Sequence, residues 1–537
     1  MLPDISLRRY LVLSLVTLNL GFATPIMAAE PDPTVQHRAA PVGFLKTSGR
    51  NILNGAGEPI FLRGINLHTY YYQYQWDENS PWQNATQQDI RYLKSLGVTA
   101  IRLALHWRYF DTDLGFQLID TYIRWCEQAG IYLILDMHIA PPDEEPSDRL
   151  LWDDPESKQA FLNLWQSIAT RYASKTIIAG YDLYNEPIPP QAADWWELVA
   201  DTIRTIRAVD KRHILFVEPP LVGDERLERV EDSNVVYSYH DYTPFVMTHA
   251  GYAWAWDSPV PNQYAYPGKA LVNTEWADWA QDAQGFRQKA STWQKVSSGW
   301  LTVPTGVEFA TVKLAASGNT GSVWFDDVSV THQGKLFNMF NASMEKSAIL
   351  DKSLPANWYF WSETGFTGKW DKKNRLATGG QYSLKITGNS SDGFGVWNQQ
   401  YNFYTNPLVK VKAGERIRVD GWVLAPDNKG EISISADYLR GIYTPYNKKQ
   451  LRLDIKKYTD WAKTNHVPLY VGEFGVISSA PKNTRHNLVR DKISIMNEAG
   501  LHWGLWAYRD LASPHFGMYL NGVLDSKLAA ELKAGLQ

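Results

Sequence analysis

The sequence predicts an α/β protein, namely a TIM (β/α)8 barrel that is interrupted between its sixth and seventh strands by an all-β, jelly-roll-like sandwich. Three observations support this prediction. Short apolar runs alternate with amphipathic helical stretches up to residue 240, and the same alternation resumes near residue 448. Between them lies a region rich in Gly, Ser and Thr, with short alternating segments. A chain of 537 residues also exceeds one ordinary domain.

Six apolar runs in the first part of the chain predict buried strands. They cover residues 60–66, 98–105, 131–136, 178–185, 213–218 and 235–240. Between them, apolar residues recur at helical spacing, as with Phe161, Trp165 and Ile168. Apolar strands that alternate with amphipathic helices form a parallel sheet covered by helices, so this part of the chain predicts successive βα units.

Two further units follow much later in the chain. A helix is expected over residues 448–465 and a strand over 467–473, and a second helix starting at Thr484 leads to a strand over 501–508. The total of eight units favours a barrel. A doubly wound sheet is the alternative, but it needs a glycine-rich phosphate loop after an early strand, and the sequence has none there.

The interrupting segment, residues 269–437, predicts a separate antiparallel sandwich. Alternating stretches such as residues 307–314 and 431–435 are typical of strands with one buried face. The barrel is then formed by residues 30–268 and 438–537. If the sandwich lies in a βα loop, both crossing points lie on the C-terminal face of the barrel, where active sites are found.

The N-terminus resembles a targeting segment. Arg8 and Arg9 precede an apolar run over residues 10–20, and small residues follow as far as Ala28. This order predicts a secretory signal peptide over residues 1–29, with general secretion favoured over twin-arginine export. The apolar run is too short to span a bilayer. We therefore expect an exported protein, periplasmic or extracellular, without stable membrane insertion after cleavage.

Composition excludes several classes of function. The formal net charge of −4 argues against nucleic acid as a partner. The single cysteine, Cys126, excludes an internal disulfide and a zinc ribbon. The 23 Trp, 29 Tyr and 19 Phe are an unusual number of aromatic side chains, which fits either stacking platforms for ligands or an aromatic core.

Two glutamates at predicted strand ends are the strongest chemical signal. Glu186 follows the fourth strand and Glu473 ends the seventh. In a barrel, residues at these positions converge on one mouth. Cleavage of a glycosidic bond requires such a pair, with one carboxyl group protonated and the other ionised.

The surrounding motifs resemble those of glycoside hydrolase family 5, the cellulase-like family. Tyr184-Asn185-Glu186-Pro187 resembles its Asn-Glu-Pro motif, and Val471-Gly472-Glu473-Phe474-Gly475 resembles its nucleophile motif. Further matches lie on other strands: Arg102 on the second, His138 on the third, His240-Asp241-Tyr242 on the sixth and Trp506 on the eighth. The matches occur in order, each at the expected strand, and they cover nearly the whole barrel.

The resemblance implies catalytic roles for two residues. Glu186 would be the general acid and base, and Glu473 would be the nucleophile of a retaining reaction. Arg102 and Tyr242 would hydrogen-bond Glu473 and keep it ionised. Asn185 would bind the 2-hydroxyl of the sugar.

Other matching residues would bind substrate around the cleavage subsite. His138 and His240 would bind or orient groups there, although His240 could instead be a structural histidine satisfied by a backbone group. Trp506 would form the floor under the sugar. Glu218, at the end of the fifth strand, is read as a supporting carboxylate or an ion-pair partner.

Two predicted loops at the barrel mouth are rich in aromatic residues. These residues are Tyr70, Tyr71, Tyr72, Tyr74, Trp76 and Trp82 after the first strand, and Tyr252, Trp254 and Trp256 after the sixth. They could line further sugar subsites or pack the loops against each other.

The inserted segment resembles a jelly-roll carbohydrate-binding module. Residues 323–328 resemble its closing strands, whereas residues 341–345 and 379–384 resemble its opening strands. Because the halves occur in reversed order, a circular permutation is expected. The candidate sugar platforms are Trp358, Trp361, Trp370 and Trp397. Asp326 and Asp327 could hold a calcium ion or make ordinary hydrogen bonds.

The sequence therefore predicts a retaining β-glycanase that acts on a β-linked polysaccharide or oligosaccharide. An endo-β-1,4-glucanase is the leading form, with a β-mannanase or a β-1,3-glucanase as alternatives. We expect a monomer that needs no metal ion and no organic cofactor. A non-hydrolytic carbohydrate-binding protein is the alternative of another class, and a transglycosylase is a third.

Overall fold

The chain is described here from a computed structural model. The described residues are 43–68, 85–143, 150–222, 226–252, 260–339, 341–348, 353–376, 380–399, 408–481, 483–510, 515–520 and 522–537. The predicted signal peptide lies outside these ranges. Within them, no helix combines the length and the apolar character that a membrane crossing requires.

Eight parallel strands close into a barrel, as predicted. They are β4 (Arg63–His68), β5 (Ala100–His106), β6 (Tyr132–Ile139), β7 (Ile178–Asp182), β8 (Ile214–Val217), β9 (Val235–His240), β24 (Leu469–Phe474) and β25 (His502–Leu505). Their order around the barrel is β24-β25-β4-β5-β6-β7-β8-β9. The first six strands therefore follow one another, and the last two close the ring between β9 and β4.

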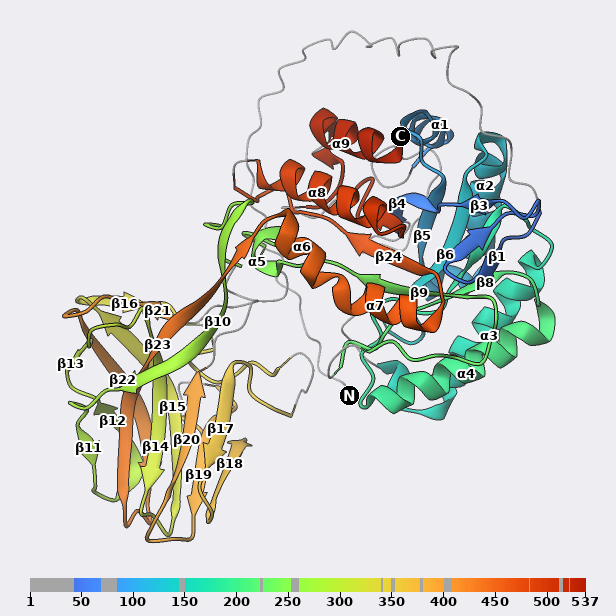
Figure 1. Ribbon diagram of the computed structural model, residues 1–537. Coiled ribbons are helices and arrows are strands. Elements are labelled where there is room, and N and C mark those ends of the chain that lie inside the picture. Colours follow the sequence, from blue (N-terminus) through green and yellow to red (C-terminus); the bar gives the residue numbers. More distant parts are fainter. Residues whose placement is uncertain are drawn as a thin grey trace, which may run out of the picture. The chain divides into compact units, whose positions relative to one another are not determined.

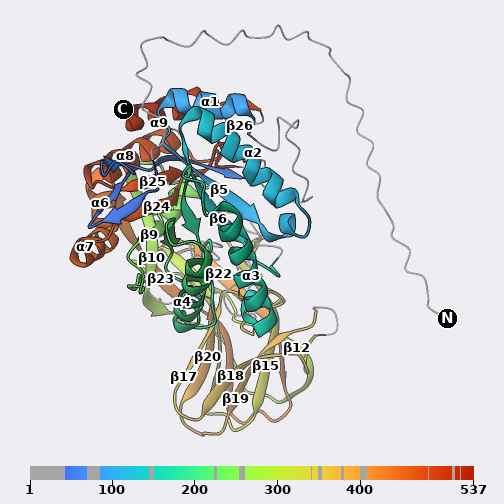
Figure 2. The same ribbon diagram turned by 90° about the vertical axis from the view of Figure 1, so that its right-hand side faces the viewer.

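Helices flank the strands on the outside of the barrel (Figure 2). They are α1 (Gln87–Leu96), α2 (Leu114–Ala129), α3 (Pro155–Tyr172), α4 (Ala192–Val209), α5 (Phe245–Thr248), α6 (Lys448–Asp454), α7 (Lys456–Asn465), α8 (Thr484–Glu498) and α9 (Ser526–Leu536), with short 3₁₀ turns η1 (Trp107–Phe110) and η2 (Leu150–Trp152). Thr86 begins α1 in a capping box with Asp89, and Gly97 ends it at a φ of 100°. The helix predicted over 448–465 is divided at Ile455 into α6 and α7.

Successive side chains of a barrel strand point alternately outward to the helices and inward to the barrel interior, so the strands contribute to two apolar layers. On β6, Leu133 and Leu135 belong to the layer shared with the helices, whereas Ile134 packs inside the barrel with Phe216 and Tyr470. Because side chains alternate with a period of two, Asp136 and His138 point to the same side as Ile134. The barrel interior is thus apolar around Ile134 and becomes polar toward the C-terminal ends of the strands.

The segment between β9 and β24 forms two antiparallel sheets. The first has the order β10-β23-β14-β20-β17, joined by β11 and β21, and the second has the order β12-β22-β15-β19-β18, joined by β13 and β16. The strands are β10 (Gly268–Trp279), β11 (Gly285–Phe286), β12 (Ala290–Ser297), β13 (Leu301–Thr302), β14 (Phe309–Ser317), β15 (Ser322–His332), β16 (Lys335–Phe337), β17 (Trp358–Ser362), β18 (Phe366–Asp371), β19 (Ser383–Gly388), β20 (Phe394–Gln399), β21 (Val409–Lys410), β22 (Arg416–Ala425) and β23 (Glu431–Tyr446). Leu314 of the first sheet and Phe325 of the second share one apolar core, so the two sheets form a sandwich.

The two ends of this segment lie side by side. Strands β10 and β23 pair antiparallel, from Gly268 opposite Tyr446 to Trp279 opposite Asp437 (Figure 1). The last strand of the sandwich therefore continues past residue 437. The chain leaves and re-enters the barrel through one pair of neighbouring strands.

Small sheets complete the described chain. They are formed by β1 (Lys46–Ser48), β2 (Asn51–Leu53) and β3 (Pro59–Ile60), and by β26 (Tyr519–Leu520) and β27 (Val523–Leu524).

The tryptophans expected to be sugar platforms divide into different environments. Trp358 and Trp397 are buried in the sandwich core, so they were wrongly predicted to be platforms. Trp370 stacks on Tyr382 at 3.8 Å between ring centroids, and Trp361 is exposed. Asp326 accepts the backbone N–H groups of Asp327 and Leu376, which favours ordinary hydrogen bonding over a calcium site.

Candidate active site

The guanidinium group of Arg102, on β5, lies at the centre of a polar cluster inside the barrel. It is fully buried and faces four carboxyl groups: Asp182 at 2.8 Å, Glu473 at 2.9 Å, Asp136 at 3.1 Å and Glu218 at 3.2 Å. Burial alone would lower the pKa of Arg102, but the surrounding carboxylates raise it well above its ordinary value. Arg102 is therefore a fixed positive charge beneath the mouth of the barrel.

Two asparagines also accept hydrogen bonds from Arg102. Its Nη1 donates to Oδ1 of Asn66 at 3.2 Å, and its Nη2 donates to Oδ1 of Asn185 at 3.1 Å. Asn185, predicted to bind the sugar, is thus held by Arg102 through its carbonyl oxygen. This orientation leaves the amide nitrogen as the group that can turn toward a substrate hydroxyl.

Glu473, at the end of β24, makes both hydrogen bonds expected of it. Oε1 accepts from Nη1 of Arg102 at 2.9 Å, and Oε2 accepts from the hydroxyl of Tyr242 at 2.9 Å. Its side chain is only 6% exposed. Burial raises the pKa of Glu473, against the lowering influence of His240 and Arg102, so Glu473 titrates above the ordinary range of a glutamate.

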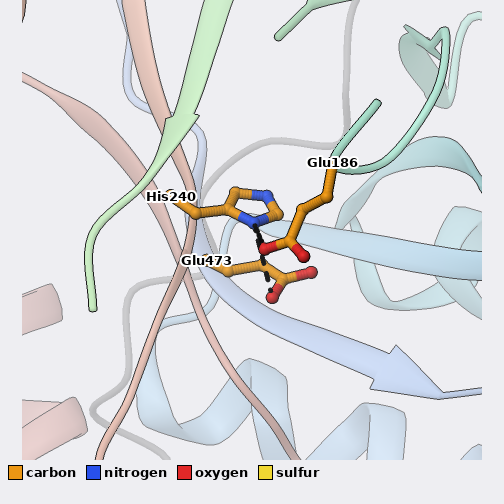
Figure 3. A group of neighbouring side chains, drawn as sticks. All are labelled: Glu186, His240 and Glu473. Atoms are coloured by element: carbon orange, nitrogen blue, oxygen red, sulfur yellow. Dashed lines mark hydrogen bonds and ion pairs between the residues drawn. The ribbon is translucent and has the colours of Figure 1, made fainter. Parts of the chain in front are cut away.

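His240, at the end of β9, lies beside the two glutamates predicted to be catalytic, and one of its ring nitrogens faces both carboxyl groups (Figure 3). Its Nδ1 lies 2.7 Å from Oε1 of Glu186 and 3.6 Å from Oε2 of Glu473, and its Nε2 lies 3.0 Å from Oε1 of Glu218. Burial alone would lower the pKa of His240, but these carboxylates raise it well above 6.5. The ring is therefore a cation with carboxylate partners, and the alternative of a histidine satisfied by a backbone group is wrong.

Glu186 follows β7 in a conformation that is uncommon for a residue with a side chain, at a φ of 45°. Its N–H donates to Oε2 of Glu218 at 3.0 Å, which helps to hold this turn. The Glu186 side chain is 28% exposed, so the two glutamates lie in different environments. Donor atoms of Glu186, His240 and Glu473 all lie within 4.8 Å of one another. One carboxyl oxygen of Glu186 and one of Glu473 thus lie within 4.8 Å of each other, which is closer to the roughly 5 Å between carboxyl groups in retaining glycosidases than to the 6.5–9.5 Å of inverting ones.

A sequence profile decides the family to which the chain belongs. The profile described as Cellulase (glycosyl hydrolase family 5) matches residues 53–324, which is half of the chain. The chain belongs to glycoside hydrolase family 5. The matched segment includes Glu186 but ends before Glu473, because the sandwich separates the last two barrel strands from the first six.

Relatives of this family 5 chain include several glycosidases. Endoglucanase C of Acetivibrio thermocellus is 27% identical over 225 residues, which is 39% of this chain and 66% of the relative. A β-xylosidase of Phanerodontia chrysosporium is 27% identical over 255 residues, which is 38% of this chain and 53% of the relative. The chain thus spans just under two thirds of the first of these relatives. Among solved structures, endoglucanase Cel5A of Thermotoga maritima is 15% identical, with a TM-score of 0.45 over 88% of this chain and 96% of that one.

The predicted substrate-binding residues His138 and Trp506 lie next to each other in the family 5 barrel. His138 has its Nδ1 2.7 Å from Oδ2 of Asp136, and its ring stacks on Trp506 with centroids 5.1 Å apart. Burial lowers the pKa of His138 to about 4, which favours the neutral ring, and its Nδ1 shares a hydrogen bond with the carboxyl group of Asp136. His68 packs on Trp506 at 4.1 Å between centroids. The indole is thus held in place by two histidine rings.

Sequence reasoning assigned no role to Asp182 and gave Glu218 only a general one. Asp182, the last residue of β7, accepts from Nε of Arg102, and it lies inside the apolar run predicted over residues 178–185. A charged residue within a run that is otherwise buried is rare unless it is paired, and this signal could have identified it. Glu218 links Arg102, His240 and the backbone of Glu186. Burial would raise the pKa of Glu218, but His240 and Arg102 lower it, so Glu218 stays ionised.

The donor set of Glu186, His240 and Glu473 resembles a metal site in residue types and spacing. A histidine binds a metal ion through a neutral ring. The carboxylates around His240 raise its pKa and favour the protonated ring. A metal ion would have to displace that proton before it could bind to His240.

Most of the aromatic residues predicted at the mouth lie outside the described residues. These are Tyr70, Tyr71, Tyr72, Tyr74, Trp76, Trp82, Trp254 and Trp256. Tyr252 is described, and its ring lies 6.3 Å from His249 and 6.5 Å from Phe516, so it packs within a loop cluster.

Replacing Tyr242 by phenylalanine is expected to move the acidic limb of kcat/KM to higher pH, by about one pH unit. The Tyr242 hydroxyl donates to the ionised form of Glu473, so its loss disfavours ionisation and raises the pKa of Glu473 further. A pH profile on an aryl β-glycoside measures the shift. Tyr443→Phe is the matched control because it removes a tyrosine–glutamate hydrogen bond in the sandwich, to Glu308. An unchanged limb in Tyr242→Phe, or an equal shift in the control, would contradict the assignment.

Proposed function

We propose that this chain hydrolyses β-glycosidic bonds in a polysaccharide or oligosaccharide with retention of anomeric configuration. The observation that carries the proposal is the spacing of Glu186, which follows β7, and Glu473, at the end of β24: one carboxyl oxygen of each lies within 4.8 Å of the other. A water molecule placed for direct attack on the far side of the sugar would need a wider separation.

In the proposed first step, Glu473 attacks the anomeric carbon while Glu186 protonates the leaving glycosidic oxygen. The bond between the anomeric carbon and that oxygen breaks, and a covalent glycosyl–enzyme forms on Glu473. In the second step, Glu186 takes a proton from water, the water oxygen attacks the anomeric carbon, and Glu473 leaves as a carboxylate.

The neighbouring residues support these steps by charge and position. Arg102 and Tyr242 hydrogen-bond the two oxygens of Glu473 and stabilise the carboxylate as it leaves. His240 contacts Glu186 directly and lies near Glu473, so it fixes Glu186 close to the bond to be cleaved. Asn185 is oriented by Arg102 for a contact with the sugar 2-hydroxyl.

We further propose a β-1,4-glucan as substrate, cleaved at internal bonds. The family is described as cellulase, and several curated relatives are named endoglucanases. Other relatives are named β-xylosidase and glucan 1,3-β-glucosidase, so a β-1,3-glucan remains an alternative together with β-mannan. The intact carboxylate pair favours hydrolysis over a purely carbohydrate-binding role.

The wild-type protein is expected to cleave a soluble cellulose derivative faster than β-1,3-glucan, β-mannan or xylan. Viscosity should fall before many reducing ends appear, which marks cleavage at internal bonds. Proton NMR of the first products should show the β-anomer, because double displacement retains configuration. An α-anomer as first product would refute the proposed roles of the two glutamates. Binding without cleavage of any substrate would favour the carbohydrate-binding alternative, and transfer to sugar instead of water would favour a transglycosylase.

The proposed organisation also includes export and an inserted module. We propose that residues 1–29 are a signal peptide that directs the protein to the periplasm or the exterior, where it acts as a monomer. We propose a barrel domain of residues 30–268 and 438–537, and an inserted module of residues 269–437 related to carbohydrate-binding modules. The adjacent ends of β10 and β23 support insertion of the module as one unit.

A further inference from the structure

The outer face of the first sandwich sheet carries a groove with a volume of about 1040 Å³. Aromatic side chains stand at both edges of this sheet. On β10, Trp276 is 55% exposed and Trp279 is 48% exposed, and on β17, Tyr359 is 52% exposed and Trp361 is 38% exposed. Strands β10 and β17 are the two ends of the sheet order, so the aromatic rims lie four strand spacings apart, roughly 19 Å.

The floor between these rims is built from small and polar side chains. Ser433 and Ser435 of β23 and Thr311 of β14 line it. Their neighbours along the strands, such as Ile434 and Val312, point into the sandwich core. Because side chains alternate along each strand, the small polar residues form the floor of the groove, and the larger aromatic side chains form its rims.

Polar contacts connect the rims through the floor. Nε1 of Trp361 donates to Oδ1 of Asn398 at 2.7 Å, and Nδ2 of Asn398 donates to Oδ2 of Asp437 at 2.8 Å. Lys313 lies 3.6 Å from Oδ1 of Asp437, and its Nζ lies 5.3 Å from the ring centroid of Trp279. The network orients aromatic groups on both sides before any ligand binds, which reduces the entropic cost of binding.

We propose that this groove binds a single chain of an uncharged, β-linked polysaccharide. A sugar ring has apolar C–H faces that stack on aromatic rings and hydroxyl groups at its edge that hydrogen-bond to amides, carboxylates and hydroxyls. The described lining offers both kinds of partner. Its charged side chains are Lys313, Glu431 and Asp437, which gives no cationic surface for phosphates or for an acidic polymer.

The groove is a binding site and not a second active site. Asp437 is engaged by Asn398 and Lys313. The other carboxylate of the described lining, Glu431, lies six residues away along β23, roughly 20 Å, which is too far to share an acid–base reaction with Asp437. Holding one part of a polymer here raises the local concentration of the rest of that polymer around the same molecule. The inference rests on the proposed function in one respect: we take the bound polysaccharide to be the same polymer that the barrel cleaves.

The test replaces one residue on each rim, in the variant Trp276→Ala/Tyr359→Ala. Both side chains are about half exposed, so truncation leaves the core intact. In a Glu473→Ala background that prevents cleavage, binding of hydroxyethylcellulose, β-1,3-glucan and galactomannan is measured by affinity electrophoresis, and binding of cellohexaose by calorimetry. We expect the affinity of one class of binding site to fall by about tenfold or more for at least one of these ligands. With Glu473 intact, kcat/KM on an aryl β-cellobioside should stay unchanged, whereas activity on the polymer should fall.

Trp300→Ala is the matched control. Trp300 is also an exposed tryptophan of the sandwich, but it packs against Arg416 and Arg418 outside the groove lining. It should leave binding unchanged, and Trp276→Phe/Tyr359→Phe should retain most of it. Unchanged thermal unfolding midpoints establish that all variants fold. Equal binding by the wild type and the alanine variant, or tighter binding of a charged polysaccharide than of every neutral one, would overturn the inference.

The two proposals fail in different ways. If the wild type cleaves no substrate, and the alanine variant loses polymer binding, the groove inference is supported and the proposed hydrolase function is wrong. If the wild type cleaves β-glucan and the alanine variant binds as tightly as before, the groove inference falls alone.

Discussion

Replacing Glu473 by alanine is expected to lower kcat on an aryl β-cellobioside by on the order of 10⁴-fold or more. The variant has no carboxylate with which to form the glycosyl–enzyme, and Arg102 and Tyr242 then point at an empty position. Added azide can enter this space and attack the anomeric carbon directly. Activity should therefore return in part, with an α-glycosyl azide as product.

Replacing Glu186 by alanine should give the opposite stereochemistry. With an activated leaving group the glycosyl–enzyme still forms on Glu473, but water is no longer deprotonated, so kcat should fall by about 10²–10⁴-fold. Azide then attacks the intermediate and gives a β-glycosyl azide. Glu228→Ala, which removes an exposed glutamate, should behave as wild type. An α-azide from the Glu186 variant or a β-azide from the Glu473 variant would show that the roles are exchanged.

Replacing Arg102 by methionine is expected to lower the free energy of unfolding by about 3–5 kcal/mol or more near neutral pH. Asp136, Asp182, Glu218 and Glu473 all face the guanidinium, and they would remain buried without it. Removing one partner of a buried ion pair leaves an uncompensated charge, and here several carboxyl groups lose the same partner. Urea unfolding of wild type and variant measures the difference.

The loss of stability in Arg102→Met should depend on pH. In the wild type, burial already raises the pKa of Asp136, Asp182 and Glu473, whereas Glu218 is held below its ordinary value. Losing the guanidinium raises the folded-state pKa of all four further, so the folded variant binds more protons than the folded wild type and more than the unfolded chain. Its free energy of unfolding therefore falls as pH rises, and the deficit relative to wild type should shrink as pH falls toward about 4.

Arg485→Met tests whether this dependence comes from the cluster of carboxyl groups. Arg485 is also buried, but its ion pair is with Asp525 and its other hydrogen bonds are to backbone carbonyl oxygens, with Asp510 as a second, more weakly acting charge. Its loss should destabilise the protein with a weaker pH dependence. The same pH dependence in both variants would contradict the assigned role of the Arg102 cluster.

The barrel could be predicted because its strands are buried and its helices are amphipathic. Both patterns depend on the spacing of residues within one strand or helix, so they can be recognised on either side of the long segment between β9 and β24. The position of Glu473 followed from the same reasoning, since the seventh strand ends at that residue. The contacts of Asp182 and Glu218 could not be predicted, because they depend on which residues the barrel closure brings together and not on their sequence neighbours.

The sandwich shows a second limit of sequence reasoning. Trp358 and Trp361 belong to the same strand, yet Trp358 lies in the core and Trp361 faces the groove. The alternation is visible in the sequence, but which phase points outward depends on the partner sheet. Trp276 and Trp279 lie near the start of the predicted insertion, and their exposure in the groove depends on β10 forming an edge of this sheet, which the sequence pattern does not reveal.

The position of the insertion also affects how the protein is made. β9 ends at His240 and β24 starts at Leu469, so the ribosome must synthesise the whole sandwich before the seventh strand emerges. At a synthesis rate of about 5–20 residues per second, this delay lasts roughly 10–45 s. During that time β4 and β9 are open strand edges, which other chains can pair with. The nascent barrel also holds Glu186 without Glu473, so its catalytic pair forms only after the inserted sandwich has been synthesised.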